Sequence, residues 1–138
     1  MLAGAVYSGT RRLDKPGHTL PDDAPLTVKG RDHPWVSRDG VKLVHALDHF
    51  GIDPQGCVCL DIGASTGGFA DVLLAHGAAR VYAVDVGHGQ LAWTLRNDAR
   101  VVVLERTNAR ELTRAHVPES VVFVLVKWHL GSIFCCRE

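Results

Sequence analysis

The sequence predicts an α/β domain built on a parallel sheet, because strand-like and helix-like segments alternate along residues 57–85. A short apolar run at 57–62 is followed by a glycine-rich loop, a helical segment at 69–77 and a second apolar run at 80–85. The first run carries Asp61 near its end, and the second closes on Asp85. Ligands of parallel sheets bind beyond the carboxyl ends of the strands, so we expect a nucleotide-type ligand over this loop.

Composition narrows the class of protein. The chain has 138 residues, of which 46% are hydrophobic and 22% charged, so it can form a packed core. Its formal net charge is zero, so any RNA site must be a local patch. The longest apolar run, at 121–126, is too short to span a bilayer, and no membrane partner is predicted. Cys57 and Cys59 fit as small core residues in a reducing, cytoplasmic location.

Residues 1–32 form a separate region. Two short strands are predicted around Gly9, followed by a turn-rich segment with three prolines and a further strand near 26–30. Arg11, Arg12 and Lys15 lie on or beside the predicted hairpin. These three cations are either a solvated face or a small phosphate-contacting patch, and the residues alone leave both interpretations open.

A helix is predicted from Gly40 to Phe50, with Ser37 or Asp39 as its cap. Apolar residues recur along it with the spacing of one buried face. Its polar side carries Lys42 and two histidines at 45 and 49, which have the spacing of a helical metal pair. Because no third ligand is in view, we interpret the histidines as solvated and predict no metal.

The remaining elements follow the second strand in order. Gly87 and Gly89 loosen the backbone beside the proposed ligand, and residues 91–95 suit a short helix or turn. A third strand is predicted at 100–105, a helix at 109–116 capped by Thr107 or Asn108, and a fourth strand at 120–126. Residues 127–138 show no usable periodicity. The predicted sheet therefore has about four parallel strands.

The loop pattern D-x-G-x-x-x-G-G indicates the ligand. It begins at Asp61 and carries glycines at 63, 67 and 68, while Asp85 is placed to accept hydrogen bonds from ribose hydroxyls. This spacing favours S-adenosylmethionine over a dinucleotide. An NAD-type dinucleotide-binding protein and an α/β core without a ligand remain as alternatives.

Three long stretches closely resemble the hemolysin A-type (TlyA) family: WVSRDGVKLVHALDHFGID, CLDIGASTGGFADVLLAHGAARVYAVDVGHGQLAW and LRNDARVVVLERTNAR. Members are ribosomal-RNA ribose 2′-O-methyltransferases with an FtsJ-like catalytic domain. The resemblance implies a Rossmann-like S-adenosylmethionine-dependent methyltransferase domain over residues 33–138. Residues 1–32 are similar to the second half of an α-L-type RNA-binding domain, which favours RNA contacts by Arg11, Arg12 and Lys15.

The resemblance also implies site roles. S-adenosylmethionine is the cofactor, and ribosomal RNA or ribosomal subunits are the partners. Lys42 matches the first lysine of the family's Lys-Asp-Lys-Glu tetrad, which aligns a ribose hydroxyl and takes its proton. The implied cofactor contacts group as the methionine loop, the ribose acid with its neighbours, and the adenine turn: Asp61, Gly63, Ser65, Gly67 and Gly68; Asp85, Val86 and Gly87; Asn108 and Ala109.

The resemblance fails after the fourth strand. Lys127 stands near the position of the family's catalytic aspartate, and Asp39 stands where the family usually has glycine. We expect a chain truncated at both ends, whose residues 127–138 depart from the family as a shifted reading frame would make them. On this view the fourth strand is left without neighbours, as an unpaired apolar edge at 121–126, and the chain does not methylate RNA. A non-catalytic RNA- or nucleotide-binding remnant is the alternative function.

Overall fold

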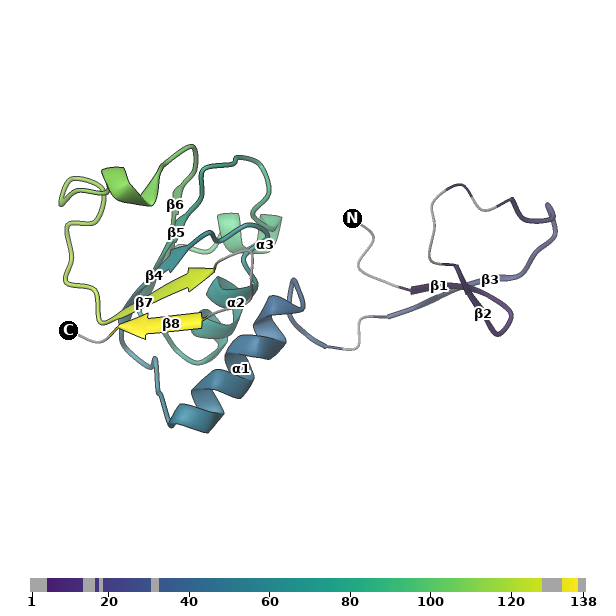
Figure 1. Cartoon of the computed structure of the whole chain (residues 1–138), viewed down its shortest axis with the longest axis horizontal. Helices are drawn as coiled ribbons and strands as arrows, with labels where there is room; N and C mark the ends of the chain where they lie inside the picture. Colours follow the sequence, from purple (N-terminus) through teal and green to yellow (C-terminus); the bar gives the residue numbers. More distant parts are fainter. Residues whose placement is uncertain (1–4, 14–16, 18, 31–32, 128–132, 137–138) are drawn as a thin grey trace. The chain divides into compact units, whose positions relative to one another are not determined.

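The computed structural model describes residues 5–13, 17, 19–30, 33–127 and 133–136 (Figure 1). The chain divides into two compact units, Met1–Pro34 and Trp35–Glu138. Within the described residues, every helix is too short or too polar to cross a membrane.

The first unit contains a three-stranded antiparallel sheet. Its strands are β1 (Ala5–Ser8), β2 (Arg11–Leu13) and β3 (Leu26–Lys29), in the order β2-β1-β3. Gly9 has a φ of 60° in the turn between β1 and β2, a conformation that glycine adopts without steric cost. The predicted hairpin around Gly9 and the strand near residue 26 are therefore confirmed.

The second unit is built on a five-stranded sheet of order β6-β5-β4-β7-β8. Its strands are β4 (Val58–Ile62), β5 (Arg80–Val84), β6 (Val101–Leu104), β7 (Phe123–Lys127) and β8 (Ile133–Cys136). The first four are mutually parallel, as predicted, and β8 is antiparallel to β7. The chain builds outward from β4 to β6 and then returns to add β7 on the other side of β4. This switch point is where parallel sheets bind ligands.

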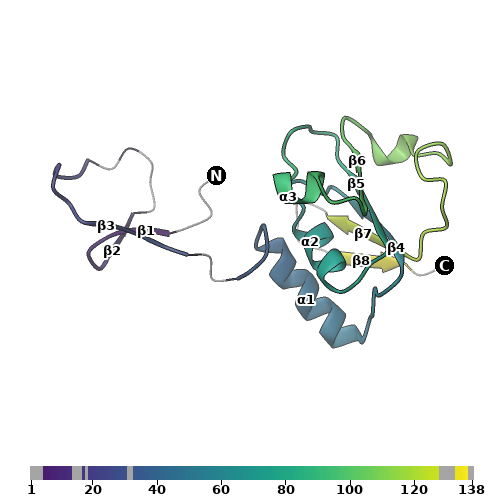
Figure 2. The same ribbon diagram turned by 180° about the vertical axis from the view of Figure 1, so that it is seen from behind.

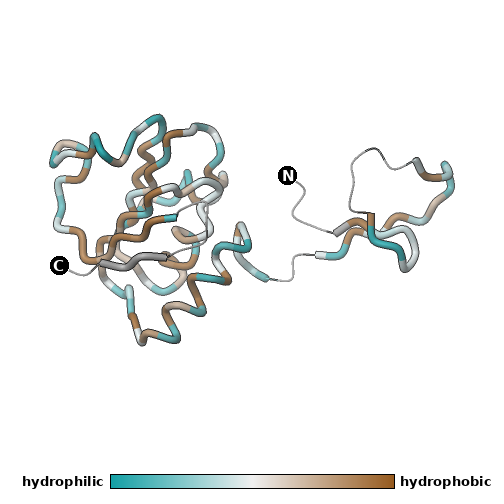
Figure 3. Tube along the Cα trace, in the orientation of Figure 1, coloured by the Kyte–Doolittle hydropathy of each residue, from teal (hydrophilic) through white to brown (hydrophobic). Residues whose placement is uncertain are grey.

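Three helices cover one face of this sheet: α1 (Asp39–Phe50), α2 (Gly68–Ala75) and α3 (Trp93–Arg96) (Figures 1 and 2). Leu43 and Leu47 of α1 pack with Phe69 and Leu73 of α2 in the larger of two buried clusters. The strands beneath these helices are among the most hydrophobic parts of the chain (Figure 3). Burial on both faces explains why these strands read as continuous apolar runs in the sequence.

The connection from β6 to β7 covers the opposite face. Val117 from this connection is buried with Leu60, Tyr82 and Val84 of the sheet. The Tyr82 hydroxyl donates a hydrogen bond of 2.7 Å to the carboxylate of Glu119. This polar contact fixes the connection to the sheet where regular structure is sparse.

The prediction of a helix at 109–116 is wrong. The segment contains only one 3₁₀ turn, η1 (Ala109–Glu111), which Asn108 caps by accepting a hydrogen bond from the Arg110 amide. Beyond it, the Thr113 amide donates to the His116 ring, and the Ala115 amide donates to the Thr113 hydroxyl. The turn ends at Leu112, whose backbone is extended with a ψ of 134°, and local bonds between side chains and backbone follow it.

Two further expectations are wrong. The fourth strand does have neighbours on both sides, because β7 pairs with β4 and also with β8 (Figure 1). Residues 127–138 thus include the strand β8, which at four residues is too short for an apolar pattern in the sequence to predict it. At the start of α1, the cap position is Arg38 and no side chain caps the helix.

Candidate functional site

The glycine-rich loop runs from the end of β4 to the start of α2. The Gly63 and Ala64 amides donate to the Val84 carbonyl at 2.8 and 3.0 Å, which carries the loop across the end of β5. Gly63 and Gly67 have φ values of 81° and 94°, where a side chain is strained. Glycine is therefore required by the backbone at these two positions.

Each loop glycine also lies in close contact with a neighbouring segment. A Cβ at Gly63 would lie 3.0 Å from the Lys127 carbonyl oxygen, and one at Gly67 would collide with Leu91 and Leu95. A Cβ at Gly68 would collide with the Ser37 hydroxyl. The glycines therefore let α1, β7 and the 91–95 segment converge on one edge of the sheet.

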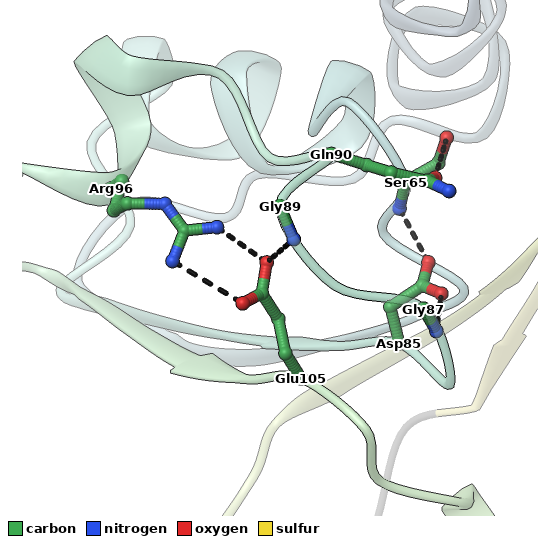
Figure 4. Close-up of polar contacts among 7 residues, drawn as sticks. All are labelled: Ser65, Asp85, Gly87, Gly89, Gln90, Arg96 and Glu105. Atoms are coloured by element: carbon green, nitrogen blue, oxygen red, sulfur yellow. Dashed lines mark hydrogen bonds and ion pairs between the residues drawn. The ribbon is translucent and has the colours of Figure 1, made fainter.

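Asp85 joins two loops at this edge (Figure 4). One carboxylate oxygen accepts from the Ser65 amide at 2.7 Å, and the other accepts from the Gly87 amide at 2.8 Å. The Thr107 amide donates to the Asp85 carbonyl at 3.0 Å, which adds the loop after β6. An ionised carboxylate offers about four acceptor positions, so the two amides leave acceptor capacity for ligand hydroxyls.

A hollow of about 220 Å³, counting the open space at its mouth, lies beside Asp85. It is lined by residues from the ends of β4, β5 and β6 and from the loop after β5: Ala64, Ser65, Ala83, Asp85, Gly87, His88, Gln90, Leu91, Val103 and Glu105. The hollow marks the place where the ends of three strands leave an opening beside the Asp85 carboxylate.

Glu105 braces the outer wall of the hollow (Figure 4). It follows β6, accepts from the Gly89 amide at 2.8 Å, and forms a two-pronged ion pair with Arg96 of α3. The hydrogen bond from Arg96 is the main cause of the lowered pKa of Glu105, with the Gly89 amide adding to it. This contact ties the loop after β5 to α3 and β6.

Asp61 lies beneath the glycine loop with no exposed surface. Both of its carboxylate oxygens lack a hydrogen-bond partner among the described residues. Burial raises the pKa of Asp61 from 3.8 to about 7, and the nearby Ala70 amide and Lys127 lower it only in part. The site therefore holds a buried carboxyl group that a neighbouring positive charge would stabilise in its ionised form.

Asp39 links two lysines at the same edge. Its carboxylate contacts Lys42 at 3.2 Å and forms a close ion pair with Lys127 at the end of β7. Partial burial works to raise the pKa of Asp39, but the hydrogen bonds and charges of Lys127 and Lys42 outweigh it and lower the pKa. The Lys42 side chain stays 58% exposed, so a ligand can reach its ammonium group.

The structure brings together some of the predicted site residues but not all. Ser65, Asp85 and Gly87 line the hollow, whereas Val86 is 72% exposed beside it. The Asn108 side chain is engaged in capping η1, which begins at Ala109. For RNA, Arg11 and Arg12 lie on β2, and Lys15 lies outside the described residues. Among the described residues, no three His, Cys, Asp or Glu side chains gather as a metal site requires.

The sequence analysis missed Glu105 and Asp39 as site residues. The signal for Glu105 was present, since the third apolar run closes on an acid as the second does. Asp39 was considered only as a helix cap, and its contact with Lys127 joins residues 88 positions apart in the sequence, which no local pattern encodes. Gln90, whose side chain meets the Ser65 hydroxyl at 3.4 Å, gave no signal in the sequence.

A parallel sheet with a glycine loop at its switch point and an acid after the next strand defines a Rossmann-like nucleotide-binding domain. Residues 35–127 match the model of the FtsJ-like methyltransferase family. The chain belongs to the FtsJ-like methyltransferase family.

Known relatives agree with this assignment. The chain is 54% identical over 125 residues to the 16S/23S rRNA (cytidine-2′-O)-methyltransferase TlyA of Mycobacterium tuberculosis, covering 86% of this chain and 45% of that protein. It is 44% identical over 126 residues to hemolysin A of Brachyspira hyodysenteriae, covering 91% and 52%. A solved hemolysin-type structure from Streptococcus thermophilus matches with a TM-score of 0.69 and 43% identity, over 88% of this chain and 46% of that one. The chain spans about half the length of these relatives.

The buried carboxyl group of Asp61 predicts a pH-dependent stability. Because its folded pKa of about 7 exceeds the ordinary 3.8, the folded state binds more protons than the unfolded state between these values. The Asp61 contribution to the free energy of unfolding should therefore fall as pH rises through this window, by up to about 1.4 kcal/mol per pH unit. Urea denaturation of the parent chain and of Asp61→Asn at several pH values measures this contribution.

We expect the stability advantage of Asp61→Asn to grow from pH 4 toward pH 7 and then level off. Asp23→Asn, which removes a carboxylate from an exposed loop, controls for the loss of one negative charge. A difference between parent and Asp61→Asn that does not change with pH would contradict the shifted titration.

The Glu105 contact predicts a second effect, on the loop after β5. Glu105→Gln removes the charge that holds Arg96 and weakens the acceptor for the Gly89 amide, so this loop should loosen. Hydrogen exchange should show faster exchange at the Gly89 amide, and calorimetry should show weaker binding of S-adenosylhomocysteine. Glu111→Gln, at an exposed acid of η1, is the matched control. Unchanged Gly89 exchange would show that the loop is held by other contacts.

Proposed function

We propose that this chain binds S-adenosylmethionine and serves as the cofactor-binding part of an RNA ribose 2′-O-methyltransferase that acts on ribosomal RNA in the cytoplasm. The family supplies the reaction class, and the TlyA relative is named for methylation of 16S and 23S rRNA. The observation that carries the proposal is Asp85, whose carboxylate lines the hollow and has acceptor capacity left over from two backbone amides.

The residues present fit the chemistry of this cofactor. Its adenosine portion has ribose hydroxyl groups that can donate hydrogen bonds to Asp85, whose carboxylate borders the hollow. Its sulfonium and its α-ammonium group are positive, and the buried carboxyl of Asp61 lies beneath the loop that would hold them. A cation bound nearby would favour the ionised form of this carboxyl, which burial disfavours.

We assign the predicted contacts accordingly. Asp61, Gly63, Ser65, Gly67 and Gly68 surround the methionine portion. Asp85 holds the ribose with Val86 and Gly87 beside it, while Asn108 and Ala109 border the adenine. Ser65 and Gly87 are positioned for this by their bonds to Asp85, which set the two loops before any ligand binds.

Lys42 is the residue we assign to the ribose hydroxyl. When bound, S-adenosylmethionine supplies an electrophilic methyl group on a sulfonium sulfur. Lys42 Nζ would orient the 2′-hydroxyl and, in its neutral form, take the hydroxyl proton. Asp39 restrains Lys42 through their 3.2 Å contact, but the same carboxylate is shared with Lys127. A cation thus stands at the end of β7, where the family resemblance implies an acid.

The first test concerns the cofactor. Calorimetry with S-adenosylmethionine and NAD should show binding of the former only. Asp85→Ala should weaken S-adenosylmethionine binding by roughly 1.5–3 kcal/mol, the value of a hydrogen bond to a charged group. Asp53→Ala is the matched control, because Asp53 also accepts a backbone amide but lies outside the hollow. Binding of NAD without S-adenosylmethionine would overturn the proposal.

The second test concerns methyl transfer. We expect residues 1–138 to bind cofactor without methylating RNA, because Lys127 replaces the acid of a cooperating catalytic set, and one such loss removes most of the rate. A tritium-transfer assay on bacterial ribosomal subunits and on free ribosomal RNA measures this, with Lys127→Asp and Lys42→Ala beside the parent chain. Methyl transfer by the parent that disappears in Lys42→Ala would show that Lys127 does not block the reaction.

A further inference from the structure

Lys127 lies on the face of the sheet that carries the buried carboxyl of Asp61. Strand β7 runs parallel to β4, and their register places Leu125 directly opposite Asp61. Residues opposite one another on paired strands share a face, and so do residues two positions apart along one strand. Lys127, two positions beyond Leu125, is therefore on the same face as Asp61. Leu125 packs in the larger buried cluster with residues of α1 and α2, so this is the face that the helices cover.

Two contacts show where the Lys127 side chain lies. A Cβ added at Gly63 would be 3.0 Å from the Lys127 carbonyl oxygen and 3.5 Å from the Lys127 Cβ, so the residue begins against the first glycine of the loop. At its other end, the ammonium group forms an ion pair with the Asp39 carboxylate of α1. The side chain thus extends from the glycine-rich loop to α1, and it is only 32% exposed. Water screens a partly buried charge of this kind less than an exposed one.

The carboxyl groups near Lys127 do not cancel its charge. Asp39 pairs with it, but the same carboxylate contacts Lys42 at 3.2 Å, so one anion serves two cations. Burial disfavours the ionised form of Asp61, and the Lys127 charge favours that form. Lys127 therefore already supplies part of the positive charge that would stabilise the ionised Asp61. A ligand that brings a further cation to this place gains less from Asp61 and is repelled by Lys127.

We propose that Lys127 makes this site bind S-adenosylhomocysteine more tightly than S-adenosylmethionine. The inference rests on the proposed function, in which Asp61 and Gly63 border the methionine portion of the cofactor. The two ligands differ by one methyl group and one positive charge, because methyl transfer turns the sulfonium of S-adenosylmethionine into the neutral thioether of S-adenosylhomocysteine. All their other charged groups are common to both, so the Lys127 charge distinguishes them at the sulfur. The chain thereby favours the product form of the cofactor over the methyl donor.

Calorimetry with both ligands at one fixed pH tests the proposal on the full chain. The quantity compared is the ratio of the two dissociation constants. We expect S-adenosylhomocysteine to bind the parent chain on the order of tenfold more tightly, the scale of one unit charge several ångströms away at a partly screened site. Lys127→Gln and Lys127→Met remove the charge, so the ratio should fall toward one in both. Lys127→Arg keeps the charge and should keep the preference.

The ratio separates the effect of charge from an effect on folding, because a variant that loosens the site weakens both ligands together. Arg114→Gln is the matched control, since it removes an exposed cation from the connection on the opposite face of the sheet, and it should leave the ratio unchanged. Sinefungin carries an ammonium group in place of the sulfonium and should bind the parent chain less tightly than S-adenosylhomocysteine. The order of the three ligands on the parent chain tests the inference even where a neutral variant does not fold.

Two kinds of failure are distinguishable. If the parent chain binds both ligands but does not prefer S-adenosylhomocysteine, or if its preference persists unchanged in Lys127→Gln and Lys127→Met, the role of Lys127 is overturned and the proposed function stands. An equal fall of the ratio in Arg114→Gln would overturn the role of Lys127 in the same way. Binding of neither ligand by the parent chain would overturn the proposed function, and this inference with it.

Discussion

The carboxylate of Asp85 is the contact on which the arrangement of the site depends. Parallel strands bring the ends of β4, β5 and β6 to one edge, but they do not set the paths of the loops that follow. Asp85 sets two of these paths by accepting the Ser65 and Gly87 amides, while its own carbonyl accepts the Thr107 amide from the third loop. One residue thereby turns a sheet edge into a hollow with a fixed wall, and it does so with acceptor capacity to spare.

Asp61 is the opposite case, a carboxyl group whose two oxygens lack a hydrogen-bond partner among the described residues, with only partial compensation from the nearby Ala70 amide and Lys127. Burying an ionisable group in this way costs stability, which appears as the raised pKa. Asp61 lies two positions after Cys59 in β4, so the two side chains are on the same face of the sheet. This face is covered by α2, and solvent cannot reach Asp61 there. Folded chains tolerate such a group most readily where a ligand's charge compensates it, which is why we place the positive end of the cofactor above Asp61.

Much of the fold followed from patterns that local physics controls. Apolar runs between loops predicted the four parallel strands. The spacing of apolar residues predicted α1, because those residues lie on the one side of the helix that faces the core. The failures came where local side chains or distant partners decide the structure. The helical turn ends at Leu112, whose backbone is extended, and β8 forms because the backbone of β7 offers a second edge. The loop glycines were interpreted as part of a ligand-binding pattern, yet each also lies against a neighbouring segment that the sequence does not reveal.

Lys127, at the end of β7, adds a positive charge to the site, which still contains the carboxylate of Asp39. Strand β7 is held on both sides, so Lys127 stands on a rigid support, and Asp39 reaches it from the first turn of α1. The site still has a carboxylate between two ammonium groups, but the carboxylate now comes from the same helix as Lys42. A carboxylate shared in this way restrains Lys42 less than one that serves it alone, and it adds a positive charge beside the position where a cationic cofactor would react. We therefore expect this exchange, which leaves one more positive charge at the site, to oppose methyl transfer.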